Sequence, residues 1–517
     1  MFYSKRLLKF KNIKHCFFSR QNGFSKGFYE SLNCGLGSND NKKNIFKNLD
    51  FVSDKIGCKK ESLILLNQKH SNEVIYFPNK NSAQNKLPGD AIVTQVKNIG
   101  IGILTADCAS ILFFNPKLFL VNDAIFIDDS ETFEIDDAIS LEKISNQHKL
   151  WIHIASPTSY FEYQTAIDKK ARKLISTVYL STNTYYMLPE ILIKDVFSLS
   201  DKGERESLSL GVILNEDGSI GSTEIVKSII KVDFRLNYTE ADELIDYAPK
   251  EEEDLSIISK ILQIRKCWRK NSGATEILES FGKIVVEDNK PTLKIIDPTL
   301  SRQLISEAMI LFGNIISNFT KVNKIPVPYR VQQRIDKVSK DDIHDSDNKI
   351  LNNFVLKKTM GKSYYSINPM PHSSLGLTSY LHATSPIRRY ADLIVNYQLN
   401  RFLNNKELIS KEEVEQMTLE INNQGRQNIM RYREDQKYWL NRWFENNSIK
   451  KYNVILLNWI NRYKNICILY FLDYHFSTIC NLKSKKNLNI GESFNVHNIV
   501  NNNNNDIIFF ELISLSK

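Results

Sequence analysis

Hydrophobic and polar positions in the first half of the chain follow two different patterns. In residues 1–117, glycines separate short apolar runs such as 98–105, and this pattern predicts a segment with both helices and strands. Residues 120–240 contain apolar runs typical of strands, at 123–127, 149–154 and 208–214, and a basic helical segment at 166–176. A change of pattern near residue 117 predicts a domain boundary there.

The second half begins with helical periodicity and ends with short strands. Apolar positions recur at helical spacing in residues 255–270, 300–320 and 387–445. After residue 450 the pattern returns to four strand-like runs, at 453–459, 466–472, 492–500 and 507–512. Short strands at such regular spacing, with a turn at Gly491, predict a small barrel.

The most informative run is acidic and spans residues 123–137. Four hydrophobic residues lead into six carboxylates between Asp128 and Asp137. Carboxylates this close repel one another unless a cation neutralises them or water solvates them all. Because neither His nor Cys lies among these hard oxygen donors, the cluster favours Mg²⁺, or alternatively Mn²⁺. The alternative is a solvated acidic loop, which the flanking hydrophobic residues oppose.

A second run, Ser379–Asp392, carries two adjacent arginines. Pro386 is well tolerated in the first turn of a helix, so we expect a helix to begin there and to hold Arg388 and Arg389 in its first turn. Arginines at a helix N-terminus oppose the helix dipole unless an anion binds there. The two runs together predict a phosphodiester held between cations. The alternative is an ion pair of either arginine with Asp392.

With these runs in place, the chain resembles the ribonuclease II/R family of processive 3′→5′ exoribonucleases. The resemblance covers about residues 120–445 and rests on motifs that occur in the family's order. They lie at residues 128–137, 151–155, 179–180, 187–190, 198–199, 209–212, 217–218, 273–274, 304–309, 328–330 and 384–390. An ordered set of this length is far more specific than any one of its members.

The resemblance implies a role for each matched residue of the two runs. Asp128, Asp136 and Asp137 match the family's Mg²⁺ site. Glu134, which stands where the family usually has Asp, is implied as a further catalytic Mg²⁺ ligand if the backbone can retreat to make room for its extra methylene. Arg388 matches the arginine that clamps the scissile phosphate. In such a site the metal ions lower the pKa of a bound water and stabilise charge on the attacking and leaving oxygens. Asp136 or Asp137 orients or deprotonates that water.

Three further matches imply contacts with RNA. Tyr179 corresponds to an aromatic residue that stacks on the terminal nucleotides, although core packing is an equal alternative for this residue alone. Glu307 corresponds to an acid near the terminal base, and Arg389 lies beside the phosphate clamp. A departure from the family is Asn396, where His or Gln is usual.

Residues 450–517 resemble the OB-fold RNA-binding module of these nucleases. The resemblance rests on strand spacing and on the run 488–496. Lys483, Lys485 and Lys486, with Tyr470 and Phe471 nearby, are candidates for a basic and aromatic RNA-binding surface. For the lysines a solvated loop is the equal alternative.

The first 117 residues resemble a different family, that of polyphenol oxidase (laccase-domain) and purine nucleoside phosphorylase. The matching runs are 15–20, 23–27, 31–35, 67–71 and 104–108. The resemblance implies His70 and Cys108 as remnants of a zinc site. The family's third ligand follows the Cys, but the nuclease match begins there instead, and a catalytic zinc needs three protein ligands. We therefore expect a truncated, inactive segment without zinc, joined by gene fusion or by an error of sequence assembly.

Composition narrows the class of protein. The 517 residues include 42% hydrophobic and 25% charged residues, which argues against a disordered or fibrous chain. A net charge of +9 suits a polyanionic partner. Because the chain has no apolar run of membrane-spanning length, no secretory leader at its start and seven scattered cysteines without a C-x-x-C pair, we expect a cytoplasmic protein that does not associate with membranes.

These observations give one combined expectation. The fold class is α+β and multidomain, with an N-terminal segment at 1–117, a nuclease domain with a mixed sheet at 118–447 and an OB-like barrel at 448–517. The expected protein is a monomeric, Mg²⁺-dependent exoribonuclease that degrades single-stranded RNA to nucleoside 5′-monophosphates. The alternatives are a zinc-dependent phosphorylase or oxidase through residues 1–117, and a non-catalytic RNA-binding protein.

Overall fold

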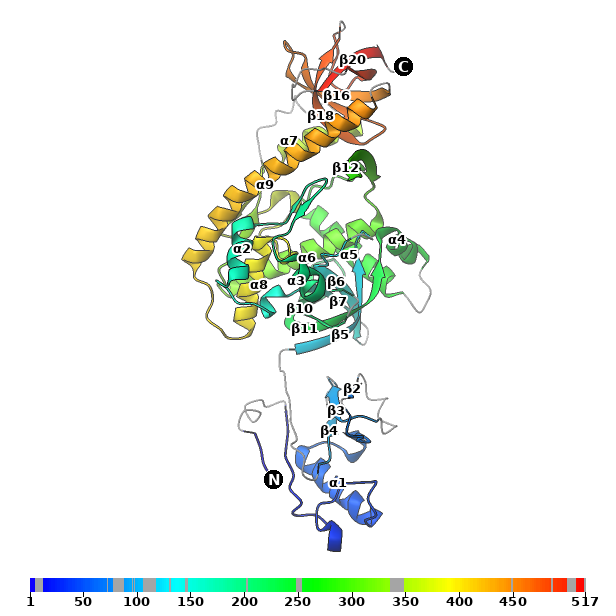
Figure 1. The fold of residues 1–517 in the computed structure, drawn as a ribbon, viewed down its shortest axis with the longest axis vertical. Coiled ribbons are helices and arrows are strands. Elements are labelled where there is room, and N and C mark those ends of the chain that lie inside the picture. Colours follow the sequence, from blue (N-terminus) through cyan, green and yellow to red (C-terminus); the bar gives the residue numbers. More distant parts are fainter. Residues whose placement is uncertain are drawn as a thin grey trace. The chain divides into compact units, whose positions relative to one another are not determined.

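The fold is known from a computed structural model (Figure 1). It describes residues 1–4, 13–71, 73–77, 88–94, 96, 98–105, 118–129, 132–144, 147–200, 203–247, 253–334, 348–447, 450–484, 487–499 and 508–515. The chain divides into two compact units, Met1–Leu120 and Val121–Lys517. The second unit therefore contains both the expected nuclease domain and the expected barrel, and the division predicted near residue 448 lies within it.

The first unit combines one long helix with short parallel strand pairs. Helix α1 (Lys42–Ile56) begins at Asn41, whose side chain accepts a hydrogen bond from Lys43 N, and ends at Gly57, which has a left-handed φ of 72°. The described strands pair as β1 (Leu63–Leu65) with β4 (Gly100–Gly102) and β2 (Val74–Phe77) with β3 (Ala91–Thr94). The mixed character expected for this segment is confirmed within its described residues.

The second unit is built around a closed barrel of five strands. These are β5 (Leu118–Ile127), β6 (Asp137–Ile144), β7 (Gln147–Ala155), β10 (Arg205–Leu214) and β11 (Ile220–Leu236), in the order β10-β11-β5-β6-β7. The strand registers described within it are antiparallel. The sheet that we expected to be mixed is thus a barrel with antiparallel pairs, which hairpin connections such as β6–β7 allow.

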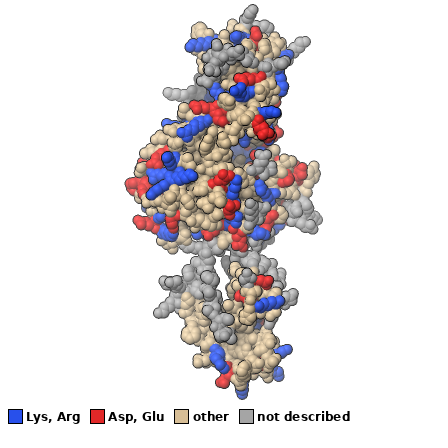
Figure 2. All heavy atoms as spheres, viewed as in Figure 1, with Lys and Arg blue, Asp and Glu red and all other residues tan. Residues whose placement is uncertain are grey.

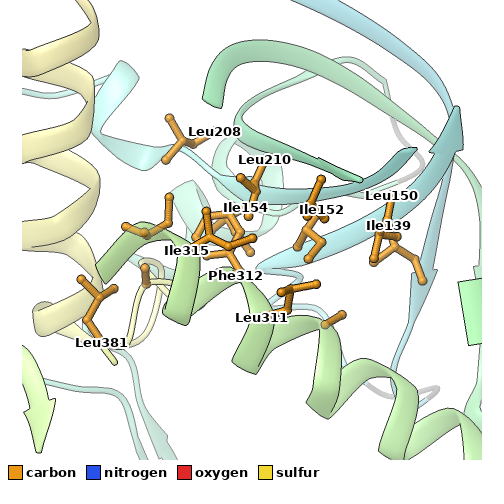
Figure 3. Close-up of a cluster of buried hydrophobic side chains, with 14 of the residues drawn as sticks. Ile139, Leu150, Ile152, Ile154, Leu208, Leu210, Leu311, Phe312, Ile315 and Leu381 are labelled. Atoms are coloured by element: carbon orange, nitrogen blue, oxygen red, sulfur yellow. The ribbon is translucent and has the colours of Figure 1, made fainter. Parts of the chain in front are cut away.

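Helices cover this barrel and complete its core. Those that contribute to the core are α4 (Tyr238–Tyr247), α5 (Asp254–Asn271), α6 (Leu300–Val322) and α8 (Tyr390–Leu403). The second unit also contains α2 (Ala166–Leu174), α3 (Glu190–Leu192), α9 (Lys411–Asn446) and α7 (Lys349–Thr359), which packs against the C-terminal barrel. Figure 3 shows Ile152, Leu208 and Leu210 of the strands lying close to Phe312 and Ile315 of α6. Burial of this apolar surface is the main driving force for placing α6 against the barrel.

The helical periodicity of residues 387–445 corresponds to two helices rather than one. Helix α8 ends at Leu403, and Asn405 then adopts a left-handed φ of 53°. Helix α9 begins after Ser410, whose side chain accepts a hydrogen bond from Glu413 N at 3.2 Å. The positive φ of Asn405 and the cap at Ser410 therefore separate two helices, although the helical spacing of apolar residues continues from one to the other.

A second closed barrel lies at the C-terminal end. Its strands are β16 (Lys451–Asn461), β17 (Ile466–Phe471), β18 (Phe476–Lys483), β19 (Ser493–Ile499) and β20 (Ile508–Leu515), in the order β16-β17-β18-β20-β19. The β18–β20 pair is parallel and the other pairs are antiparallel. The expected small barrel is confirmed, and its five strands agree with an OB-like fold.

The aromatic surface expected on this barrel is wrong for the two residues named. Tyr470 and Phe471 lie on β17 and are both buried, Phe471 in the core of the C-terminal barrel and Tyr470 in a separate cluster that includes Leu351 of α7. Lys483 ends β18 and is exposed, whereas Lys485 and Lys486 lie outside the described residues. Consecutive strand residues face opposite sides, and both sides of β17 are covered here, which the sequence run did not reveal.

Hairpin β12–β13 (Phe281–Glu287 and Lys290–Ile296) packs against the C-terminal barrel and α9. Gly282 N donates a hydrogen bond to His475 O at 2.9 Å, and a Cβ at Gly282 would come within 3.0 Å of Tyr474 O. Ile284 of the hairpin and Trp443 and Phe444 of α9 join the core of the C-terminal barrel. The remaining short pairs are β8–β9 (Val178–Tyr179, Thr184–Tyr185) and β14–β15 (Tyr329–Val331, Tyr364–Ser366).

Within the described ranges, none of the helices has the length and apolar character needed to span a membrane.

Candidate active site

The acidic run forms the connection between β5 and β6. Strand β5 ends in buried apolar side chains, Asp128 follows it directly, and β6 begins at Asp137. Hydrogen bonds anchor both ends of the connection, from Asp128 N to Leu236 O at 3.2 Å and from Ala155 N to Asp136 O at 2.8 Å. The apolar strand therefore delivers the carboxylates into the interior, as its pattern predicted.

Ser198 fixes the middle of this connection. Its hydroxyl donates to Phe133 O at 2.6 Å and accepts from Ile135 N at 3.2 Å, and Leu199 N donates to Ile135 O at 3.0 Å. The sequence analysis assigned no role to the motif Ser198–Leu199. In the structure it acts as a clamp that holds Glu134 and Asp136 on either side of Ile135.

Arg388 reaches the acidic connection from the second run. Its Nε donates to Asp136 Oδ2 at 3.0 Å, and Ile387 N donates to Asp136 Oδ1, also at 3.0 Å. Asp136 is buried, whereas the Arg388 side chain is 40% exposed. The Nε of the guanidinium is thus bound to the Asp136 carboxylate, and its terminal amino groups are open to a ligand.

The helix predicted to start at the proline of this run begins four residues later, at Tyr390. Arg388 N and Arg389 N both donate to Ser385 O, at 3.2 and 2.9 Å, and form a turn instead. Asp392 closes the turn by accepting from Ser385 N at 2.8 Å. The prediction that both arginines lie in a first helical turn is therefore wrong, because the Asp392 side chain stabilises a turn ahead of the helix.

Arg389 makes the ion pair that was the alternative for this run. Its Nε and Nη2 donate to Asp392 Oδ2 at 3.1 and 2.7 Å, and Nη2 also donates to Thr384 Oγ1. Asp392 is fully buried, so Arg389 compensates a buried charge. A contact of Arg389 with RNA stays a prediction.

The electrostatics of the cluster are unfavourable in the absence of a cation. Burial raises the pKa of Asp136 to about 7, against the attraction of Arg388. Burial also raises the pKa of Asp137 to about 7, and repulsion from Asp136 and Asp128 adds to this effect. Burial raises the pKa of Asp128 and of Glu134 as well. The four carboxylates therefore share an environment that penalises their charged forms.

The chemistry of these donors fits a hard divalent cation. All four are carboxylates, and a cation would relieve both their repulsion and their desolvation. In the described part of the chain, however, no three His, Cys, Asp or Glu side chains are already grouped closely enough to hold a metal ion. The acids are neighbours, but they do not form a preassembled ligand set, and Asp136 is engaged by Arg388.

Glu134 is engaged by hydroxyl groups from the segment after α2. The Tyr179 hydroxyl donates to Glu134 Oε2, and Thr177 Oγ1 donates to Oε1 at 3.4 Å. Thr177 N also donates to Arg388 O at 3.0 Å, so this segment contacts both parts of the site. The sequence analysis missed Thr177, whose proximity in the chain to Tyr179 was the only available signal.

Tyr179 itself is placed at the site with an exposed ring. The residue is 42% exposed, which is inconsistent with the alternative of core packing. Burial of the hydroxyl end and the negative charge of Glu134 raise the pKa of this phenol. The phenol therefore stays protonated and able to donate, while stacking on RNA stays a prediction.

Glu307 lies in a buried ion pair on α6. Arg269 of α5 donates to both of its oxygens, through Nε to Oε1 at 2.8 Å and through Nη2 to Oε2 at 2.5 Å. Arg269 Nη1 additionally donates to Leu375 O. A contact of Glu307 with a base stays a prediction, and in the structure its carboxylate is occupied by Arg269.

Asn396, where the sequence departs from the family, stabilises the backbone next to the site through side-chain hydrogen bonds. Its Oδ1 accepts from Thr158 Oγ1 at 2.5 Å and from Ser156 Oγ at 3.3 Å, and its Nδ2 donates to Ala155 O at 3.4 Å. Ala155 in turn donates to Asp136 O. The amide therefore stabilises the end of β7, where the backbone meets the acidic connection.

The zinc remnant expected in the first unit has one described member. His70 lies in a loop organised by Asp90, whose carboxylate accepts from the backbone N of Lys69, His70 and Ser71. Cys108 lies outside the described residues. The vestigial zinc pair therefore stays a prediction.

Comparison with known proteins places this barrel and its acidic connection in a family. Residues 120–405, more than half of the chain, match the RNB domain family, and the chain belongs to this family. Residues 14–122 match the family described as multi-copper polyphenol oxidoreductase laccase. Both resemblances inferred from the sequence are thereby confirmed.

Among curated relatives, the chain is similar to an uncharacterized ribonuclease of Synechocystis, with 32% identity over 65% of this chain and 51% of the relative. It is also 31% identical to the chloroplastic/mitochondrial ribonuclease II of Arabidopsis thaliana, over 65% of this chain and 43% of the relative. The chain thus spans about half the length of the curated relatives it matches.

Solved structures share the fold at low sequence identity. Mycoplasma genitalium RNase R in complex with ribose-methylated single-stranded RNA matches with a TM-score of 0.69 and 19% identity, over 77% of this chain and 72% of that one. A yeast pseudonuclease matches with a TM-score of 0.57 and 18% identity, over 70% and 50% of the two chains. The fold therefore occurs with and without nuclease activity, and activity must be argued from the site.

Proposed function

We propose that the chain is a divalent-cation-dependent, hydrolytic 3′→5′ exoribonuclease that degrades single-stranded RNA to nucleoside 5′-monophosphates. The observation that supports it most is the position of Arg388, bound through Nε to Asp136 beside three further carboxylates. Among the described residues, no hydrogen bond is made to its terminal amino groups. Those groups can bind two oxygens of a phosphate in the planar, bidentate geometry that arginine favours.

Asp128, Asp136 and Asp137 would hold the cation, Mg²⁺ or Mn²⁺, at the end of the barrel. The bound cation would supply an activated water and neutralise charge on the phosphate. Asp136 also orients Arg388, so that the phosphate clamp and the acids keep one relative position. Tyr179 offers an exposed ring on which a base of any identity can stack, and this tolerance suits degradation without sequence preference.

RNA as the substrate is consistent with the charge of the chain. The net charge is +9, and on the face shown in Figure 2 basic side chains lie among acidic ones across the second unit. The C-terminal barrel supplies an OB-like fold, a type that commonly binds single strands. We further propose that the protein acts as a monomer in the cytoplasm.

A direct test uses the full chain and a single-stranded RNA labelled at either end. With Mg²⁺, the 3′-labelled RNA should release its label at once as a mononucleotide, whereas 5′-labelled RNA should shorten progressively. A chelator should stop both reactions, and Asp136→Asn should lose activity while keeping its RNA affinity. Intact activity of Asp136→Asn would refute the assigned site.

Two other outcomes would favour the alternatives. Tight RNA binding without mononucleotide release would indicate a non-catalytic protein, which the fold shared with a pseudonuclease makes a specific second candidate. Stoichiometric zinc together with phosphate-dependent cleavage of inosine would instead indicate activity of residues 1–117.

A further inference from the structure

The Glu134 carboxylate is held by two neutral hydroxyl groups, whereas Asp136 is held by the Arg388 guanidinium and a backbone N–H. The two Glu134 oxygens each accept a hydroxyl hydrogen bond, Oε2 from Tyr179 and Oε1 from Thr177. The side-chain carboxylate of Asp137, in contrast, accepts no hydrogen bond from the described residues. Within one acidic cluster, a carboxylate committed to protein donors therefore lies near a carboxylate that is open to a ligand.

The segment that carries the two hydroxyls is held through its backbone, since Ser181 N donates to Asp435 Oδ2 at 2.9 Å just beyond Tyr179. Strand β8 is only two residues long and pairs with β9 through Val178 and Tyr179. Thr177 fixes the start of this segment through its bond to Arg388 O. Because Tyr179 is 42% exposed, packing alone does not fix the orientation of its ring, and the bond to Glu134 restrains the hydroxyl end of the ring.

The length of the Glu134 side chain matters for this bond. An aspartate at the same backbone position would be shorter by one methylene, or about 1.5 Å. A hydrogen bond lengthened by that amount is lost, since donor and acceptor must lie within about 3.2 Å. The extra methylene of Glu134 is thus what brings its carboxylate to the Tyr179 hydroxyl.

We propose that Glu134 is a positioning residue, whose carboxylate orients the Tyr179 ring for stacking on the 3′-terminal base instead of binding the divalent cation. The inference rests on the proposed function, because the RNA end must reach the acidic cluster. It assigns cation binding to the aspartates and substrate alignment to the glutamate.

Four variants test this assignment on a short single-stranded RNA. They are Glu134→Asp, Tyr179→Phe, the double variant and Glu134→Gln. Glu134→Asp and Tyr179→Phe should each raise KM by about tenfold, within the range that loss of one stacked base produces, while kcat changes less. The double variant should match the single variants, because both remove the same bond. All should need the same Mg²⁺ concentration for half-maximal rate.

Glu134→Gln keeps the side-chain length and one acceptor oxygen. A positioning role predicts a KM within about threefold of the original chain and an unchanged Mg²⁺ requirement, since an amide oxygen still accepts from the phenol. A role as metal ligand predicts the opposite, a raised Mg²⁺ requirement for both Glu134→Gln and Glu134→Asp but not for Tyr179→Phe. That result, or additive effects in the double variant, would overturn the inference.

Matched controls come from the same region. Tyr185→Phe removes an exposed hydroxyl from the partner strand β9, and Glu190→Asp shortens a glutamate in a surface pair with Lys194. Both should leave KM unchanged. If the original chain binds RNA but does not cleave it, the proposed function fails. RNA affinities measured with a chelator then decide the inference, which predicts equal weakening by Glu134→Asp and Tyr179→Phe.

Discussion

Gly313 on α6 gives a sharp test of how the core holds the arginine segment. A Cβ at this position would lie within 3.0 Å of the Leu381 carbonyl oxygen and of the Tyr380 ring. Real Cβ atoms do not approach this closely, so Gly313→Ala must displace residues 380–381. Asn314 Nδ2 also donates to Ser379 O at 3.1 Å, so that α6 is already joined to this segment.

Two opposing effects determine the size of the change. In a helix interior, Gly→Ala is favourable by about 0.8–1 kcal/mol because alanine has the higher helix propensity. Overpacking a filled core costs about 1–3 kcal/mol, and the upper part of that range applies because a backbone carbonyl cannot rotate away as a side chain can. The clash therefore prevails, and we expect Gly313→Ala to lower the free energy of unfolding by about 1–2 kcal/mol.

The same substitution at Gly425 on α9 is the matched control. A Cβ there would meet no atom within 4 Å, so Gly425→Ala should raise the free energy of unfolding by about 1 kcal/mol. Urea denaturation measures both changes. RNA turnover should fall only for Gly313→Ala, by up to about 100-fold, because the displaced segment leads to Arg388 and small displacements reduce rates strongly. Stabilisation by both substitutions would refute the close approach.

Three further results are expected. Arg388→Lys should reduce RNA turnover about 100-fold at saturating RNA, because a lysine cannot bind Asp136 and two phosphate oxygens at once; near-normal turnover would contradict the clamp. Glu307→Gln should lower the free energy of unfolding in urea by about 3 kcal/mol, since it leaves Arg269 buried without its charge partner; an unchanged urea midpoint would argue against that pair. Burial lowers the pKa of His153 to about 3, below its ordinary 6.5. The unfolded chain thus binds this proton more tightly, so the contribution of His153 to the free energy of unfolding should fall by about 2 kcal/mol from pH 6.5 to pH 5. Relative to the original chain, His153→Gln should therefore gain about this much stability over the interval, and equal pH dependence of the two chains would contradict the assignment.

Local sequence patterns predicted most helices and strands. They did not predict the turn ahead of α8 or which faces of the strands are buried. The strand at 123–127 and the helices at 255–270 and 300–320 lie within β5, α5 and α6. The helix start near Arg388 was wrong, because the Asp392 side chain stabilises a turn that periodicity does not register. The burial of Tyr470 and Phe471 was missed, because an apolar run does not tell that one side of the strand faces the barrel interior and the other is covered by α7.

For the site, the sequence by itself determined which residues carry the chemistry, since charge clustering and motif order are properties of the linear chain. Only the tertiary structure decided their partners. Asp136 and Arg388 are 252 positions apart, and Glu134 and Tyr179 are 45 apart, so their contacts depend on how the barrel and the helices pack. Packing is cooperative and non-local, because each contact forms only when the surrounding core is in place.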